Sequence, residues 1–401
     1  MKVLQINTTV NSGSHGRIAE EIGRLLIENG HKSVIAYGRT ALSSRSDLIR
    51  VGKKADLALH LVKTRLFDRH GFGSSHATKE FLKKIDDINP DIIHLHNLHG
   101  YYLNVKVLFK YFVKINRPLV WTFHDCWPFT GHCSHFQHIN CAKWTTGCYN
   151  CPLSLSYPKS LFVDNSKMNY YQKKDLFTGI NEMIIVAPSQ WLAGHLKNSF
   201  LSDYEIRIIN NGIDINKFKP VDSLVIRNKH NITKKYILGV ASTWTEKKGL
   251  EDFKQLKNIN PELDIVLVGL SMKQIHAMPP TIKAIPRTEK IEDLAALYSG
   301  AEVFINPTYS DNFPSVNLEA LACGTPVITY KTGGSSESID KKTGIVVEKG
   351  KIDRLVDAVY TILNNGKNQY TNNCRARAEL LFNKDDRYND YITLYSKILK
   401  K

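Results

Sequence analysis

Two carboxylates, Asp311 and Glu319, stand eight residues apart in the stretch SDNFPSVNLEALACGTPVITY. Pro314, which lies between them, suits the first turn of a helix, because its φ is already helical and it has no N–H group to leave unpaired. No helix breaker follows until Gly324. We therefore predict that Asp311 lies in a loop, that Glu319 lies about one turn inside a short helix, and that a buried strand follows.

The start of this predicted helix is suited to binding a phosphate group. The first backbone N–H groups of a helix have no partner within it, and the helix dipole is positive at that end. Carboxylates such as Asp311 and Glu319 accept hydrogen bonds from sugar hydroxyls. The stretch therefore predicts a pocket for a phosphorylated sugar, and the structural alternative is a loop acid followed by a solvated helix acid.

Two other loops contain residue types that bind diphosphates. Gly13 and Gly16 follow the first strand-like run, and glycine lets the backbone approach a diphosphate closely. They do not form the G-x-G-x-x-G pattern, which argues against a nicotinamide-dependent dehydrogenase. Lys247 and Lys248 follow a strand-like run in the second half, where their ammonium groups either pair with a diphosphate or remain solvated.

Five of the seven cysteines fall within residues 124–152. Four of them are Cys133, Cys141, Cys148 and Cys151, and the last two form a C-x-x-C pair. This ending is typical of half of a tetrahedral zinc site, although the first two cysteines are more widely spaced than usual. We expect a structural zinc ion, with reduced thiols and disulfides as the alternatives. Three aromatic residues of the segment either stack on a sugar or belong to the core: Trp127, Phe129 and Trp144.

Compact apolar runs alternate with helical patterns along the whole chain. The runs include KVLQINTT, DIIHLHN, PLVWTFHD and EMIIVAPS in the first half, and KYILGVAS, LDIVLVGL, AEVFINPT and TPVITY in the second. Two successive arrays of this kind predict an α/β protein with two doubly wound parallel sheets. Ligands of such sheets bind at the carboxyl ends of the strands.

The seam between the two arrays is predicted at residues 208–220, which contain Gly and several Asn. We expect an N-terminal domain over 1–207 that carries the Cys-rich insertion, and a C-terminal domain over 221–382. Aromatic and apolar residues at helical spacing predict a final amphipathic helix over 383–401 that packs back on the N-terminal domain.

The chain is basic, with 54 Lys and Arg against 38 Asp and Glu, a formal charge of +16. This charge favours a nucleotide, an anionic membrane surface or nucleic acid as a partner. We expect no nucleic-acid partner, because the basic residues are scattered and no RNA- or DNA-binding motif accompanies them. The first residues resemble a strand and not a signal peptide, and no apolar run is long enough to span a bilayer. We expect a cytoplasmic protein that meets a membrane from its inner face.

Several segments together resemble glycosyltransferase family 4, and they occur in the order found in that family. They are Gly16, FHD at 123–125, APSQWL at 187–192, INNGIDINKF at 209–218, KKG at 247–249, and the acids 311 and 319 leading into LEALACGTPVITYKTGG. The resemblance implies the GT-B fold, with two Rossmann-like domains around a cleft. It also implies retaining sugar transfer from a nucleotide-sugar with no metal needed for the chemistry.

The resemblance implies roles for residues of the second half. Glu319 matches an acid that holds the nucleotide ribose, and Asp311 takes the place of a longer Glu that contacts the donor sugar. Lys248 matches a lysine that neutralises the departing diphosphate, and Lys247 substitutes for an Arg that the family usually has nearby. The loop and helix start between the two acids face the sugar and phosphate: Asn312, Phe313, Pro314 and Ser315.

In the first half the resemblance implies that Gly16 lies near the diphosphate and that His124 lies close to the reacting sugar, which it orients and polarises. The region around the cysteines resembles an insertion found in some polysaccharide-building relatives. We expect a glycosyltransferase of hexosyltransferase type that acts on a lipid-linked or oligosaccharide acceptor in bacterial surface polysaccharide synthesis. The alternatives are a nucleotide-sugar 2-epimerase and a non-enzymatic binder of anionic surfaces or nucleic acid.

Overall fold

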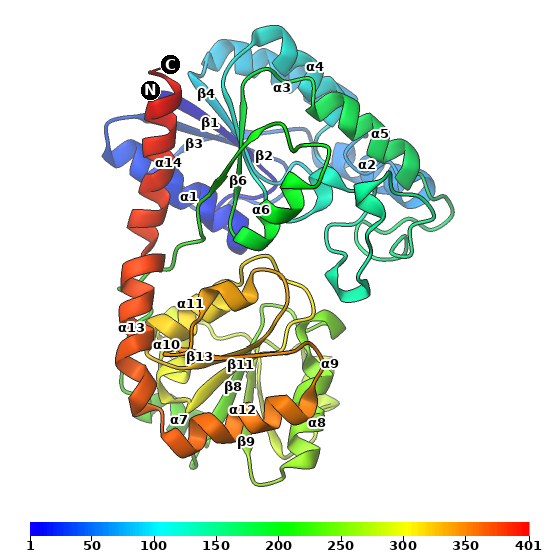
Figure 1. Cartoon of the computed structure of the whole chain (residues 1–401). Helices are drawn as coiled ribbons and strands as arrows, with labels where there is room; N and C mark the ends of the chain where they lie inside the picture. Colours follow the sequence, from blue (N-terminus) through cyan, green and yellow to red (C-terminus); the bar gives the residue numbers. More distant parts are fainter. Residues whose placement is uncertain (401) are drawn as a thin grey trace. The chain divides into compact units, whose positions relative to one another are not determined.

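The computed structural model describes residues 1–400 and divides into two compact units (Figure 1). Unit 1 comprises Met1–Asn210 together with the chain from Tyr388 onward, and unit 2 comprises Asn211–Arg387. The predicted linker, residues 208–220, contains the first of these two boundaries. Within residues 1–400, no helix is both long enough and apolar enough to cross a bilayer.

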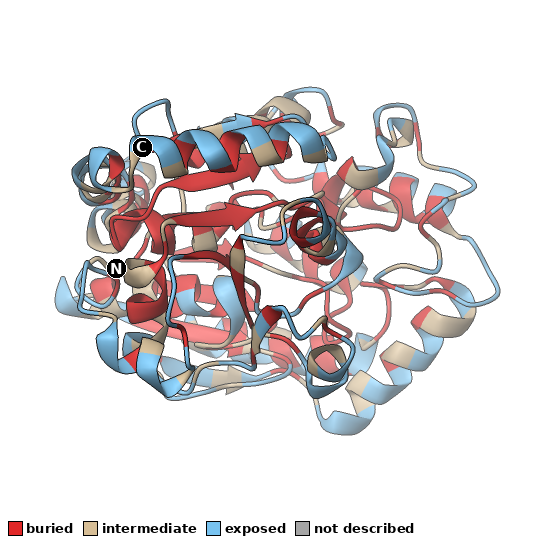
Figure 2. Cartoon of the chain, turned by 90° about the horizontal axis from the view of Figure 1, so that it is seen from below, coloured by how far each residue is buried: buried red, intermediate tan, exposed pale blue. Residues whose placement is uncertain are grey.

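Unit 1 is built on a seven-stranded parallel sheet of order β3-β2-β1-β4-β5-β6-β7. The strands are β1 (Lys2–Asn7), β2 (Lys32–Tyr37), β3 (Asp47–Arg50), β4 (Ile92–Leu95), β5 (Leu119–Thr122), β6 (Met183–Ala187) and β7 (Glu205–Ile208). Its helices are α1 (Gly13–Glu28), α2 (Lys54–Phe67), α3 (Ser75–Ile88), α4 (Val105–Ile115), α5 (Ser166–Phe177) and α6 (Gln190–Lys197). Strands β4 and β5 are buried along their whole length, as expected for a sheet covered on both faces. Figure 2 colours buried residues red and shows strands that are largely red.

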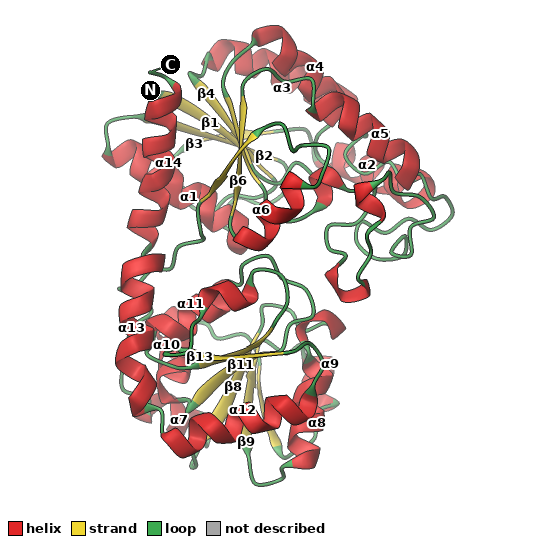
Figure 3. Cartoon of the chain, viewed as in Figure 1, coloured by secondary structure: helices red, strands yellow, loops and turns green. Residues whose placement is uncertain are grey.

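Unit 2 is built on a six-stranded parallel sheet of order β10-β9-β8-β11-β12-β13 (Figure 3). The strands are β8 (Tyr236–Val240), β9 (Asp264–Val268), β10 (Ile282–Ile285), β11 (Val303–Asn306), β12 (Val327–Tyr330) and β13 (Gly344–Val347). Its helices are α7 (Leu224–Lys229), α8 (Leu250–Ile259), α9 (Met272–His276), α10 (Ile291–Gly300), α11 (Ser315–Ala322), α12 (Ile352–Asn365) and α13 (Asn368–Phe382). The prediction of two doubly wound parallel sheets is confirmed.

The order of each sheet reverses next to its first strand. In unit 1 the reversal lies between β1 and β4, and in unit 2 it lies between β8 and β11. At such a point the loops after the two central strands diverge to opposite faces, and this leaves a crevice at the carboxyl end of the sheet. We therefore expect the functional residues in the loops after β1, β4, β5, β8 and β11.

The last helix, α14 (Lys384–Ile398), contributes an aromatic face to the core of unit 1. The hydroxyl of Tyr391 accepts a hydrogen bond from Thr122 Oγ1 at 3.1 Å, and the hydroxyl of Tyr395 lies 2.6 Å from His94 Nδ1. Both hydroxyls thus have partners in the interior, so these tyrosines can be buried without an unsatisfied polar group.

The segment between β5 and α5, which contains the Cys-rich residues, is organised by turns. Three short 3-10 helices occur in it: Trp127–Phe129, Gln137–Ile139 and Lys143–Thr145. Trp127, Phe129 and Trp144 are at most 5% exposed and belong to the core of unit 1. Of the two alternatives for these rings, the structure supports the core and not stacking on a sugar, because the side chains are already covered by protein.

Candidate functional site

In unit 2, the predicted residues Lys248 and Asp311 form an ion pair. Lys248 Nζ lies 2.5 Å from Asp311 Oδ2, and the two side chains are 33% and 19% exposed. Lys248 follows β8 and Asp311 follows β11, which are the two strands at the reversal point of the sheet. The structure therefore brings together a cation and a carboxylate that lie 63 residues apart in the sequence.

Close packing of the backbone holds these two loops together. Gly249, directly after the lysines, has φ +72°, and a Cβ there would lie 2.3 Å from the carbonyl oxygen of Pro307. Tyr309 N donates a hydrogen bond to the carbonyl of Lys247 at 2.8 Å. Only a glycine permits this approach, because a side chain would clash with backbone that cannot move aside. The KKG sequence is thus explained by the need to dock Lys247 and Lys248 on the loop after β11.

The loop that carries Asp311 is fixed from its other side by Gly333. A Cβ at Gly333 would lie 1.6 Å from the carbonyl oxygen of Asp311, and Gly333 has φ +53°. The neighbouring Phe313 is buried in the core of unit 2, and its carbonyl accepts a hydrogen bond from Asn211 Nδ2 at 3.0 Å. Asn312 is also buried. The loop is therefore held rigidly, as a binding site on a loop requires.

Helix α11 begins as the sequence predicts. Pro314 is its N-cap with φ −71°, the helix runs over Ser315–Ala322, and Gly324 at φ +73° follows its end. Glu319 is 7% exposed, and its Oε2 accepts a hydrogen bond from the Tyr298 hydroxyl at 3.0 Å. The alternative of a solvated helix acid is therefore wrong, because Glu319 is a buried carboxylate with hydrogen-bonding partners.

A buried polar network beneath α11 was not predicted from the sequence. Asn317 Nδ2 donates to Ser335 and Ser338, and Asn317 Oδ1 accepts from Asn306 Nδ2 at 2.8 Å. Asn317 is fully buried. An amide within the mostly apolar run VNLEALA was the signal available in the sequence, since a buried amide needs partners. The network ties α11 to the loop after β12 and so fixes the direction of the helix start.

In unit 1, Gly16 lies within the first turns of α1 and is buried. A Cβ there would lie 2.7 Å from Thr9 Oγ1 and 3.3 Å from the Thr9 carbonyl, and Asn11 N donates to the Gly16 carbonyl at 3.0 Å. Glycine at this position lets the loop after β1 fold directly over the helix start. This close packing requires a glycine whether or not a diphosphate is bound.

His124 follows β5 and contacts His96, which follows the neighbouring strand β4. The two rings are stacked with centroids 5.3 Å apart, and His96 Nδ1 lies 3.0 Å from His124 Nε2. His96 Nε2 lies 3.0 Å from Gln5 Oε1 of β1. Burial lowers the pKa of His124 well below its usual value, and the neighbouring His96 adds to this effect. His124 is therefore a neutral imidazole near pH 7.

A second series of hydrogen-bonded side chains in unit 1 was not predicted from the sequence. His99 Nε2 lies 2.6 Å from Asp125 Oδ2, both side chains are 9% exposed, and the Tyr157 hydroxyl lies 3.0 Å from His99 Nδ1. Burial opposes ionisation of Asp125, but the charge and hydrogen bond of His99, with the Trp127 N–H, hold its pKa well below the usual value. Asp125 belongs to the quoted FHD segment, so its residue type was visible but its partners were not.

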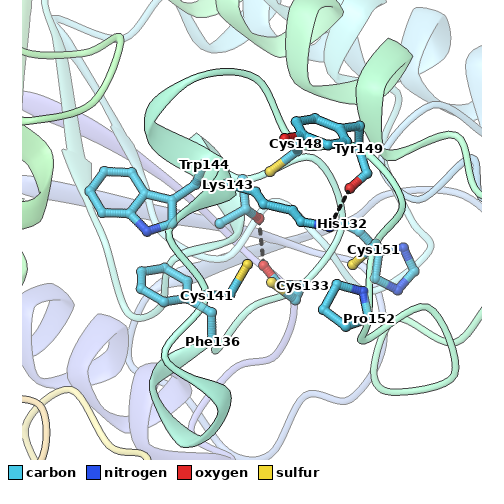
Figure 4. Close-up of a pocket in the computed structure, with 11 residues that line it drawn as sticks. His132, Cys133, Phe136, Cys141, Lys143, Trp144, Cys148, Tyr149, Cys151 and Pro152 are labelled. Carbon is cyan, nitrogen blue, oxygen red and sulfur yellow. Dashed lines mark hydrogen bonds between the residues drawn. The ribbon is translucent and has the colours of Figure 1, made fainter.

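The four predicted cysteines line one small pocket, which Figure 4 shows. All seven cysteines of the chain are free thiols. Cys133 and Cys151 hydrogen-bond to each other, and this bond lowers the pKa of Cys151 to about 7. Over residues 1–400, no three His, Cys, Asp or Glu side chains are already arranged as a set of metal ligands. The four thiols therefore line one pocket, but they are not yet arranged around a common position for a metal ion.

The chain matches two family models that together cover most of its length. Residues 15–217 match the model described as Glycosyltransferase Family 4, and residues 222–380 match Glycosyl transferases group 1. A relative in Escherichia coli (strain K12), "Putative colanic acid biosynthesis glycosyl transferase WcaC", is 26% identical over 378 residues, with 89% of each chain covered.

Solved structures show the same architecture. Sucrose-phosphate synthase from Thermosynechococcus elongatus superposes with a TM-score of 0.72 at 19% identity, covering 100% of this chain and 99% of the other. Anabaena HepE in complex with UDP-glucose gives 0.68 at 15% identity, with coverage of 99% and 100%. These similarities establish the GT-B fold, and the match of a family model over half of the chain establishes the family. The chain is a glycosyltransferase and belongs to glycosyltransferase family 4.

Proposed function

We propose that the protein transfers a sugar from a nucleotide-sugar to a lipid-linked or oligosaccharide acceptor, with retention of the anomeric configuration. The observation that carries the proposal is the ion pair of Lys248 and Asp311 at the reversal point of the unit 2 sheet, directly before the helix that holds Glu319. This position is where doubly wound sheets bind nucleotides. Anabaena HepE, whose fold is similar, is described in complex with UDP-glucose, which supports a nucleotide-sugar as the donor.

Each unit 2 residue has a role in donor binding under this proposal. Glu319 accepts hydrogen bonds from the ribose hydroxyls. Its burial and the hydrogen bond from Tyr298 already hold the carboxylate in position for this. Lys248, supported by Lys247, faces the diphosphate. Asp311 accepts from a sugar hydroxyl. The loop and the start of α11 approach the sugar and phosphate through Asn312, Phe313, Pro314 and Ser315.

Asp311 is one methylene shorter than the Glu found at this position in relatives. Its ion pair with Lys248 offers a reason why the shorter side chain suffices, because the lysine holds the carboxylate in one place. When the diphosphate binds, Lys248 exchanges part of its contact with Asp311 for the phosphate oxygens. The carboxylate is then left to accept from the sugar.

The chemistry follows from where charge develops. As the bond between the anomeric carbon and the diphosphate breaks, the sugar becomes positive and the diphosphate becomes more negative. Lys248 and the N–H groups at the start of α11 stabilise the departing diphosphate. That diphosphate takes the proton of the acceptor hydroxyl on the same face, so configuration is retained without a pair of flanking carboxylates. His124, neutral and hydrogen-bonded to His96, orients the reacting sugar.

The acceptor side of the proposal draws on the relatives and on an exposed surface. The relatives include the WcaC protein named above and a capsular polysaccharide biosynthesis glycosyltransferase, CapM, of Staphylococcus aureus. They support a role in the synthesis of a bacterial surface polysaccharide. Many such acceptors are carried on lipids, so we place the reaction at the cytoplasmic face of the membrane.

An exposed apolar surface on unit 1 is consistent with membrane contact. Leu161 N donates to the carbonyl of Arg65 at 2.8 Å, which joins the loop before α5 to α2. The exposed apolar side chains of these two segments include Leu59, Val62, Phe67, Leu155, Leu161 and Phe162. Lysines lie among them at positions 54, 63 and 159. Apolar side chains beside lysines favour the surface of an anionic bilayer.

Binding of nucleotide-sugars gives a first test of the proposal. We expect one class of nucleotide-sugar to raise the melting temperature, because a ligand at 100 times its dissociation constant stabilises a protein by about 2.7 kcal/mol. The matching nucleoside diphosphate should also bind, and an unrelated nucleotide serves as the control. Failure of every nucleotide and nucleotide-sugar to stabilise the protein would contradict the proposal.

A further inference from the structure

We propose that the thiolates of Cys133, Cys141, Cys148 and Cys151 bind one zinc ion, which holds the segment between β5 and α5 in its folded form. The four cysteines come from a segment organised by turns, yet their side chains line the same pocket. In Figure 4 the sulfur atoms face a shared space, with the rings of Phe136 and Trp144 on one side and His132 on the other. Four thiolates complete the tetrahedral shell of a structural zinc ion.

The backbone around the C-x-x-C pair is shaped to present both sulfurs to the pocket. Cys148 has φ +28°, a backbone conformation that is uncommon for a residue other than Gly, Asn or Asp, and Asn150 has φ +44°. Gly131 N donates a hydrogen bond to Cys148 Sγ at 3.2 Å. A Cβ at Gly131 would lie 2.8 Å from Cys148 Cβ and 2.1 Å from the Ser166 carbonyl. An N–H group aimed at sulfur at this distance stabilises a thiolate ligand from outside the metal shell.

The charges buried around the pocket match such a centre. A zinc ion with four thiolates carries a net charge of −2. Lys173 is fully buried, and its Nζ donates to the carbonyls of Trp127 at 2.7 Å and Thr130 at 3.0 Å. In the described part of the chain, no carboxylate lies within ion-pair distance of Lys173 Nζ. A buried ammonium group needs a nearby negative charge. Cys148, Asp68, Cys133 and Asp125 all act electrostatically on Lys173, and its Nζ lies 3.5 Å from the centre of the Trp127 ring. A zinc–thiolate centre would add negative charge to these surroundings.

His132 provides a second polar group with a partner on only one side. Its Nδ1 lies 2.6 Å from Asp68 Oδ1, and the two side chains are 0% and 1% exposed. Its Nε2 is buried without a hydrogen-bond partner, and the ring lines the pocket next to Cys151. Such an unpaired nitrogen is costly unless a polar partner is provided. Asp68 fixes the ring through Nδ1, and in Figure 4 the ring lies beside Cys151, so the zinc centre would place charged thiolate ligands on this side of the ring.

Binding of the ion requires a local rearrangement of side chains. Each Sγ must move to about 2.3 Å from the zinc and lose its proton. All four cysteines already line the same pocket, so their side chains start close to one another. Side-chain rotation within the pocket then brings Cys141 and Cys148 to the ion.

The zinc also gives the segment a function beyond its own stability. The segment contains Tyr157, whose hydroxyl contacts His99, and His99 pairs with Asp125 directly beside His124. Loss of the ion would release Tyr157 from its contact with His99. This consequence rests on the proposed function of unit 1. The presence of zinc does not, so the two can fail independently.

The test is the metal content of the full chain, purified with a non-thiol reductant and without chelators. We expect about one zinc per chain by elemental analysis. Single Cys→Ser variants at each of the four positions should lose at least most of this zinc. Cys126→Ala is the matched control, because Cys126 is buried in the same segment but does not line the pocket, and it should keep the full amount.

A second measurement keeps the test valid if a variant fails to fold. Wild-type protein stripped by a chelator should take up cobalt with the visible absorption of a tetrahedral thiolate complex. It should also recover one zinc per chain, while nucleotide binding by unit 2 is unchanged. Zinc below 0.1 per chain in the wild-type protein, with four accessible thiols at these positions and no cobalt spectrum, would overturn the proposal. Zinc retained by all four serine variants would also overturn it.

Discussion

Lys248 Nζ and Asp311 Oδ2 lie 2.5 Å apart and join the loops that follow the two central strands of unit 2. This contact gives Lys248 a defined position before any diphosphate binds. A cation that is already positioned stabilises the developing charge without further reorganisation. The remaining exposure of both side chains leaves them open to a ligand.

Replacement of Lys248 by Ala should reduce turnover more than it weakens donor binding. The diphosphate gains charge only as its bond to the sugar breaks, so the lysine acts mainly in the transition state. We expect kcat to fall by about 100-fold or more, the range found for removal of one such group. Lys254→Ala, which removes a surface lysine paired with Glu251 in α8, is the control. Normal turnover of Lys248→Ala would exclude this role.

Replacement of Glu319 by Gln should weaken binding of the nucleotide. A neutral amide accepts weaker hydrogen bonds from ribose hydroxyls than a carboxylate, so we expect a loss of about 1 to 3 kcal/mol in binding free energy. Calorimetric titration with the nucleoside diphosphate measures it. Glu348→Gln, at an exposed ion pair with Lys331, should leave the affinity unchanged. If Glu319→Gln binds the nucleotide as well as the wild type, Glu319 is not in the site.

The pair of Asp125 and His99 should make the stability of unit 1 depend on pH in the acid range. The pKa of Asp125 is lowered in the folded state, so its contribution is fully present above the unfolded pKa near 4 and is lost as pH falls toward the folded pKa. Wild-type protein should therefore lose stability between about pH 5 and pH 3. Asp125→Asn should lose less over this interval.

Urea unfolding followed by tryptophan fluorescence measures this difference, since four of the five tryptophans lie in unit 1. Asp86→Asn is the control, because Asp86 is an exposed carboxylate of the same unit that contacts only Tyr111. Equal loss of stability in wild type and Asp125→Asn would show that the pair does not stabilise the folded state.

The exposed apolar surface of unit 1 should bind anionic vesicles. Burial of a large apolar side chain is worth about 1.5 to 3 kcal/mol, so the double change of Leu161 and Phe162 to Ser should lower vesicle affinity by about tenfold or more. Co-sedimentation with phosphatidylglycerol vesicles measures this affinity. Leu380→Ser removes an exposed leucine from unit 2 and should have no effect. Equal binding by the double variant and the wild type would show that this surface does not contact the membrane.

Local sequence patterns predicted the features that depend on neighbouring residues. The start of α11 at Ser315 and the turn at Gly324 followed from Pro and Gly, whose backbone preferences are intrinsic. The two parallel sheets followed from alternating apolar runs and helical patterns. These features need no knowledge of distant contacts, which is why composition and spacing sufficed.

Features that depend on distant contacts could not be predicted in this way. Tyr157 and His99 are 58 residues apart, and no spacing rule relates them. The burial of Glu319 against Tyr298 required the packing of α11 on α10, so the choice between a solvated and a buried acid stayed open in the sequence. The thiols of residues 133–151 were visible as a cluster, but the buried Lys173 and His132 beside them were not.

Sugar transfer from a nucleotide-sugar with retention is tested most directly by a reaction in which both substrates are followed. The donor identified by thermal stabilisation is incubated with and without a panel of lipid-linked and oligosaccharide acceptors, and donor and product are analysed by NMR. We predict that the donor is stable alone, that an acceptor releases the nucleoside diphosphate, and that the new bond has the donor's anomeric configuration. Conversion of the donor sugar without an acceptor would indicate an epimerase, and an inverted product would contradict the retaining mechanism.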